Sequence, residues 1–179
     1  MKTPQVSSLC LLVPALIAAS TLNAPAAAYL KFDTVDGDAT APGHVGEIDV
    51  LCFNHSLSRS NTAVLPALSE FTVTKSLDKA SPKLAEACAA GQPLAMCVLS
   101  ARKAGSTTTN DYYVVALENV FITSYRAGAS CGSGSDQIPT ETISMSYTRI
   151  IWTYEPQDTN GVPTGSKIIG RWPAGPPPP

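Results

Sequence analysis

The sequence is poor in charged residues and in histidine, and both shortages narrow the possible classes of function. Lys, Arg, Asp and Glu make up 15% of the 179 residues, and the formal net charge is −2. No run of Lys or Arg occurs, so nucleic acid is not expected as a partner. The two histidines, His44 and His55, stand apart from any Cys, Asp or Glu set with ligand spacing, and no Cys-x-x-Cys pair exists. We therefore expect no metal site and no cofactor.

Long hydrophobic runs are also missing, apart from one near the N-terminus. Residues 9–19 are apolar but too few to span a bilayer as a helix. A basic Lys2 precedes them and the small residues Ala26–Ala28 follow, which predicts a secretory signal peptide over residues 1–28. The alternative is a buried N-terminal helix, but Pro14 and Pro25 would interrupt it.

Cleavage of the predicted signal peptide would leave a mature chain that begins at Tyr29. We expect this chain to be a bacterial secreted or periplasmic protein with no membrane contact after cleavage. It would carry the four cysteines Cys52, Cys88, Cys97 and Cys131. In an oxidising compartment these allow two disulfides in three connectivities. Cys88–Cys97 with Cys52–Cys131 is favoured, because a short turn joins the predicted helix end to the next strand; plain buried thiols remain the alternative.

The rest of the sequence predicts a mainly β structure. Thr, Val, Ile and Tyr recur in short alternating stretches, which is typical of strands. The predicted strands cover residues 29–32, 47–53, 71–75, 94–103, 112–125, 140–155 and 167–172. A single helix is expected, with Ser81 as N-cap, Pro82 at its first position and Gly91 as its C-terminal stop.

Bend signals inside the long strands favour a small antiparallel barrel of two sheets, with the helix on its flank. In residues 140–155 the alternation of apolar positions slips by one residue at Thr148–Arg149, which predicts a β-bulge. Residues 112–125 are expected to form one long strand, or two strands with a bend near Glu118–Asn119. Residues 173–179 contain five prolines and cannot extend a sheet, so we expect a disordered tail or a polyproline II spacer.

Three patterns suggest chemistry but are better explained by structure. Residues 128–132 match G-x-S-x-G, yet no helical segment follows Ser130, as a hydrolase nucleophile elbow requires. The acidic cluster in residues 33–38 lacks the spacing of a calcium loop and is expected to be a solvated turn. Strand tyrosines such as Tyr112 and Tyr154 are expected to pack in the core and at subunit contacts. We therefore expect no catalytic residues.

Taken in order, the segments resemble those of a known family. The segments that match are Tyr29–Phe32, Glu47–Leu51, Phe71–Lys75, Asp78–Pro82 with Leu84, Ala87–Cys88 and Gly91, Arg102–Gly105, the strand from Tyr112, Glu141–Met145, Tyr154–Gln157 and Lys167–Trp172. Each piece is short, but the ordered set resembles the Hcp family, the tube proteins of bacterial type VI secretion. The resemblance covers residues 29–172.

The resemblance implies a small β-barrel of two sheets with one helix. It implies homohexameric rings that stack into a tube and carry effector proteins, with sheath and spike proteins as further partners, and no enzyme activity. A signal peptide is atypical of the family. It favours the alternative of a stand-alone exported domain of this fold, acting as a binding or surface module.

The long polar segment Asn54–Glu70 is expected to be a loop that binds another subunit. Long loops in compact domains usually have such a role, and the resemblance implies a contact with the next ring here. The apolar residues expected at this contact are Leu57, Val64, Leu65 and Leu68.

Overall fold

The computed structural model describes residues 27–59, 61, 67–104, 106, 108–129 and 139–173. These residues form strands and one helix in the order β1 Ala27–Phe32, β2 Ile48–Val50, β3 Cys52–Asn54, β4 Leu57–Ser58, β5 Ala67–Leu68, β6 Phe71–Ser76, α1 Ser81–Ala90, β7 Leu94–Arg102, β8 Tyr113–Gly128, β9 Thr140–Ser146, β10 Arg149–Tyr154 and β11 Ile168–Trp172. The prediction of a mainly β chain with one short helix is confirmed.

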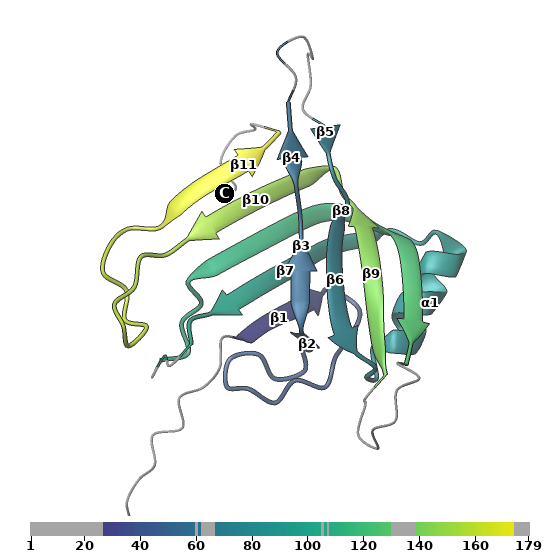
Figure 1. Cartoon of the computed structure of the whole chain (residues 1–179), viewed down its shortest axis with the longest axis horizontal. Helices are drawn as coiled ribbons and strands as arrows, with labels where there is room; N and C mark the ends of the chain where they lie inside the picture. Colours follow the sequence, from purple (N-terminus) through teal and green to yellow (C-terminus); the bar gives the residue numbers. More distant parts are fainter. Residues whose placement is uncertain are drawn as a thin grey trace, which may run out of the picture.

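The long strand β8 belongs to both of the main sheets. Its first half pairs with β7 on one edge and β10 on the other, in a sheet ordered β2-β1-β7-β8-β10-β11. Its second half pairs with β9, in a sheet ordered β8-β9-β6-β3. All pairings are antiparallel, and the two sheets wrap around one core (Figure 1).

The expected closed barrel is corrected to two sheets whose ladder does not close. β2 lies beside β6 without a ladder between them. The predicted strand over residues 47–53 is divided at Leu51, which is 61% exposed. Ile48 and Val50 face the core from the first sheet, and the chain then crosses to the second sheet as β3. A change of sheet thus takes the place of a continuous strand.

The predicted bulge at Thr148–Arg149 is likewise a change of sheet. The chain leaves the second sheet at the end of β9 and enters the first as β10, so the slip in apolar phase marks two strands with different partners. The Thr148 N–H donates to the Glu118 carbonyl across this corner, at 3.0 Å. Of the two alternatives for residues 112–125, the structure has one long strand, and within it Asn119 has a φ of 52°, in the left-handed region that Asn tolerates.

Helix α1 packs on β8 through Leu84 and Ala87, both buried. Gly91 ends the helix in the left-handed conformation, as predicted. The predicted N-cap is wrong, since Ala80 holds that position and Ser81 already lies within the helix. Instead of capping, the Ser81 hydroxyl accepts the Asp78 N–H at 3.0 Å, while the Asp78 carboxylate accepts the Ala80 N–H at 2.9 Å.

Candidate functional site

The segment predicted as a loop over Asn54–Glu70 contains a two-stranded hairpin that projects beyond both sheets (Figure 1). Leu57 pairs with Leu68 in its ladder, and the Ser69 N–H donates to the Ser56 carbonyl at 3.1 Å. Of the residues predicted to contact another subunit, Leu57 is 47% exposed and Leu68 is half-buried. Val64 and Leu65 lie outside the described residues.

His55 anchors the base of the hairpin to the corner between β9 and β10. Its Nε2 lies 2.6 Å from the Tyr147 hydroxyl, and its ring lies against Phe71 and Trp152, with centroids 5.5 and 6.2 Å away. Burial lowers the pKa of His55, so the neutral ring is favoured. The histidine therefore serves as a structural hydrogen-bonding group here.

Two hollows open beside this anchor and share Trp152. One, of about 310 Å³, is lined by Phe53, Asn54, His55, Phe71, Tyr113, Val115 and Trp152. The other, of about 350 Å³, lies between the hairpin and strands β10–β11. The first hollow is lined by several aromatic rings but exposes mainly polar surface. The second is lined mainly by two tryptophans, two leucines and two arginines, and exposes mainly apolar surface.

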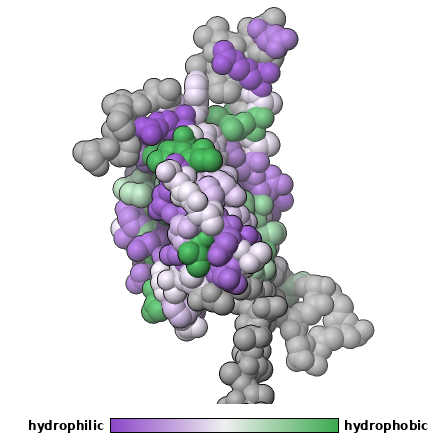
Figure 2. Space-filling model, turned by 90° about the vertical axis from the view of Figure 1, so that its left-hand side faces the viewer, coloured by the Kyte–Doolittle hydropathy of each residue, from purple (hydrophilic) through white to green (hydrophobic). Residues whose placement is uncertain are grey.

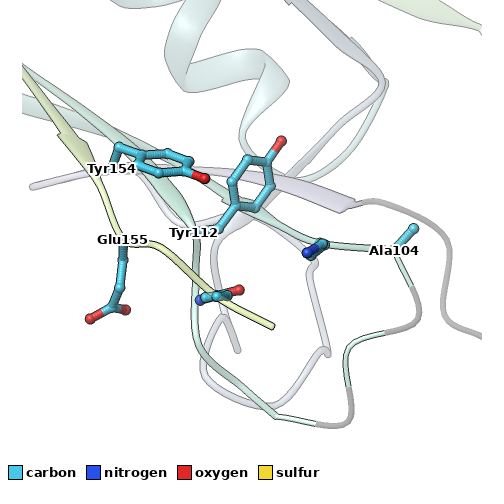
Figure 3. A pocket seen from close by; sticks show the side chains of 6 residues that line it. Ala104, Tyr112, Tyr154 and Glu155 are labelled. Atoms are coloured by element: carbon cyan, nitrogen blue, oxygen red, sulfur yellow. The ribbon is translucent and has the colours of Figure 1, made fainter. Parts of the chain in front are cut away.

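A third pocket, of about 260 Å³, lies at the end of β10, where the chain continues beyond the first sheet. Its residues are Lys103, Ala104, Tyr112, Tyr154, Glu155 and Gln157. Tyr112 and Tyr154 meet edge to face with centroids 6.4 Å apart, and Figure 3 shows both rings beside the pocket. Tyr154 is 44% exposed and so does not pack in the core of this subunit, and its expected role in a subunit contact stays a prediction.

A buried polar network holds the second sheet to the start of α1. Lys75 Nζ lies 2.7 Å from Glu141 Oε1 and 2.6 Å from Asp78 Oδ1, and Lys75 and Glu141 are shielded from solvent. The Tyr125 hydroxyl donates to Glu141 Oε2 at 2.6 Å. Burial, followed by this bond and the Glu141 charge, raises the pKa of Tyr125 to about 12. The network joins β6, β8 and β9, and its role is structural.

His44, expected to have no ligand partners, lies between two carboxylates. Its Nδ1 is 2.8 Å from Glu47 and its Nε2 is 3.0 Å from Asp111, and its ring stacks on Tyr29 at 4.0 Å. The sequence does not reveal this cluster because Asp111 is 67 positions away. Among the described residues no three His, Cys, Asp or Glu side chains could hold a metal ion together.

The remaining predicted groups do not converge on one site. Cys52, Cys88 and Cys97 are free thiols, and burial raises the pKa of the Cys97 thiol. Cys88 and Cys97 are therefore not bonded to each other in this structure. Ser130 and Cys131 lie outside the described residues, so a bond between Cys52 and Cys131 stays a prediction. Within the part of the chain that the structure describes, no helix is long and apolar enough to cross a membrane.

Comparisons with known proteins agree with this architecture. A family model described as "Type VI secretion system effector, Hcp" matches residues 29–154. Protein hcp1 of Pseudomonas aeruginosa is 27% identical over 152 residues, covering 80% of this chain and 92% of that protein. A solved structure described as a type six secretion system protein matches with a TM-score of 0.70 and 31% identity, covering 81% of this chain and 92% of the other.

Hcp1 of Salmonella typhimurium has the same fold, with a TM-score of 0.70 at 20% identity, covering 83% of this chain and 94% of that one. The family model covers residues 29–154, which lie within the stretch covered by the ordered segments and by the two-sheet fold. Because that model spans more than half of the residues, this protein belongs to the Hcp family of type VI secretion proteins.

Proposed function

We propose that this protein is a structural subunit of a type VI secretion-like tube, in which homohexameric rings stack end to end, and that it is not an enzyme. Membership of the Hcp family supports this proposal. The observation that carries it is the β4–β5 hairpin, which projects from a two-sheet body and exposes Leu57 at 47%. An apolar side chain on a projecting element is suited to burial against another copy.

Ring closure needs a second, different contact on each subunit. Strand β11 is a candidate, because it pairs only with β10 and so has one edge without a ladder in the described structure. Ile168 and Ile169 on this strand are 64% and 51% exposed. Figure 2, seen from the side of the β10–β11 loop, shows apolar patches set among polar residues. Effector, spike and sheath proteins are the further partners that the tube role implies.

Export is the second part of the proposal. The signal-like residues 1–28 support release of a chain that begins at Tyr29. Ala27 and Ala28 pair with Arg102 and Ala101 in β1, so cleavage after Ala28 would shorten β1 but leave its ladder positions Tyr29–Phe32, which include the three buried residues of the strand. Intact mass of protein recovered from periplasm or medium would identify the first residue. The same measurement under non-reducing conditions would count free thiols and so test the two disulfides.

Assembly is tested on purified protein that begins at Tyr29. Light scattering is expected to give the mass of six copies, and negative-stain electron microscopy is expected to show rings and short stacks. A stable monomer at micromolar concentration would contradict the tube role and favour a stand-alone exported module. Comparison with protein that begins at Met1 shows whether the N-terminal segment alters assembly.

A further inference from the structure

The groove between the hairpin and strands β10–β11 contains every tryptophan of the protein. It has a volume of about 350 Å³ and is lined by Leu57, Ser58, Arg59, Leu68, Trp152, Arg171 and Trp172. The sequence has two tryptophans, and both line this groove while remaining half-buried. Part of each indole surface is therefore free to contact something that enters the groove.

Trp152 has a well-defined place in this groove. It stands opposite Gly170 in the β10–β11 ladder, and a methyl group added to Gly170 would lie 3.5 Å from its Cε3 atom. The ring therefore lies over the backbone of β11, with His55 on a neighbouring side at a centroid distance of 6.2 Å. The groove thus has a preformed aromatic floor.

Two arginines supply hydrogen-bond donors at the same groove. Arg59 follows the first strand of the hairpin and Arg171 lies in β11. Neither has an ion-pair partner among the described residues, whereas a guanidinium carries five N–H donors. An aromatic floor with spare donors suits an extended segment whose carbonyls are unpaired. A polyproline II segment has that property, since it makes no internal hydrogen bonds, and such segments bind aromatic-lined grooves.

The protein carries such a segment at the edge of the groove. Trp172 lines the groove, and residues 173–179 follow it with the sequence PAGPPPP. In polyproline II form, residues 174–179 would reach about 19 Å at 3.1 Å per residue. We propose that residues 174–179 dock as a polyproline II segment in the groove of their own subunit and brace the β4–β5 hairpin against β10–β11.

Covalent attachment favours the subunit's own segment over a proline-rich segment of another molecule. The segment begins at the wall of the groove, so its effective concentration there is set by a linker of one or two residues. Proline also loses little conformational freedom on docking, because its φ is already fixed. The inference concerns how the hairpin is held within a single subunit and does not require assembly, although Leu57 lines the groove and is also the residue proposed for stacking.

The test uses the tryptophans as probes. Trp172 is next to the segment in sequence and would respond to any change there, so Trp172→Phe is introduced to leave Trp152 as the sole reporter. In this background Pro176, Pro177, Pro178 and Pro179 are all changed to Ser, which keeps the length of the chain. We expect the emission of Trp152 to shift to the red and its quenching by acrylamide to rise at least twofold. Unchanged emission and quenching would overturn the proposal.

Two further measurements complete the test. In the otherwise unchanged chain, each tryptophan gives one indole N–H resonance. The serine substitutions are expected to shift both resonances, and a shift of Trp172 alone would contradict docking in the groove. The effect is expected to be the same at all protein concentrations, whereas a response that grows with concentration would assign the segment to a neighbouring copy. Leu77→Ser, at an exposed residue that does not line the groove, is the control and should alter neither signal.

Discussion

Lys75 and Glu141 stand directly opposite each other in the β6–β9 ladder, with Nζ and Oε1 2.7 Å apart and both side chains excluded from solvent. A buried ion pair adds little net stability compared with apolar side chains at the same positions. The loss of one partner, however, leaves the other charge unpaired in an apolar interior and so destabilises the fold. Asp78, 2.6 Å from the same ammonium group, compensates for only part of such a loss.

We therefore expect Glu141→Leu to lower the free energy of unfolding by about 3 kcal/mol or more. The double variant Lys75→Met with Glu141→Leu should lose clearly less than the single variant, because no unpaired ammonium remains at that position. Urea denaturation measures both. The matched control is Lys83→Met, which removes an exposed ion pair with Glu86 at 2.8 Å. It should not measurably change the free energy of unfolding. An equal fall in the free energy of unfolding in the single and double variants would contradict this expectation.

The Tyr125 hydroxyl is expected to lose its proton at a higher pH than an ordinary tyrosine does. Burial and the bond to Glu141 raise its pKa from 10.0 to about 12. Since the folded-state pKa is the higher one, the stability from the neutral phenol is complete below pH 10 and is lost as the pH rises toward 12. Phenolate absorbance should show a late transition that disappears in Tyr125→Phe. If the parent and the variant gave the same titration curve, Tyr125 would not be the tyrosine responsible for the transition at high pH.

His55 should make stability depend on pH in the mildly acidic range. Burial lowers its folded-state pKa below 6.5, so the unfolded chain takes up the proton first. The contribution of the neutral ring is therefore complete above pH 6.5 and falls as the pH drops below that value. Thermal melting of the parent and His55→Gln from pH 7.5 to 5 should show a steeper decline in the parent. If the melting temperatures of the parent and the variant fell in parallel with pH, His55 would not be the cause of the pH dependence.

Shortening the hairpin tests the proposed stacking contact. Replacing Ser58–Ala67 by a Gly-Ser turn removes no strand of either main sheet, so the circular dichroism spectrum should stay that of the parent. Stacks should become fewer in electron micrographs, while single rings persist. A full-length variant with Leu57→Ser should weaken stacking in the same direction, because it removes an exposed apolar contact. Stacking equal to the parent in both variants would exclude the hairpin as the contact.

The strand positions could be predicted from alternation because burial on one face of a sheet imposes a period of two residues. Pairing partners could not, since Leu51 and Thr148 look like ordinary strand residues until the chain is seen to change sheets there. The contact of His44 with Asp111 was hidden for a related reason, because it joins two loops that carry no periodic pattern. The Ser81 assignment failed because the helix begins one residue earlier than predicted, with Ala80 at the N-cap and no side-chain cap hydrogen bond.

The sharing of β8 between the two sheets also has a mechanical consequence. Hydrogen bonds in an antiparallel ladder run perpendicular to the strands. A pull along β8 would therefore load the bonds to β7, β10 and β9 together in shear, rather than opening them one after another. Strand β11 is bonded to β10 alone, so a force that lifts it away from the sheet would break its bonds in succession. Under tension the body of each subunit should thus yield last and this outer strand first.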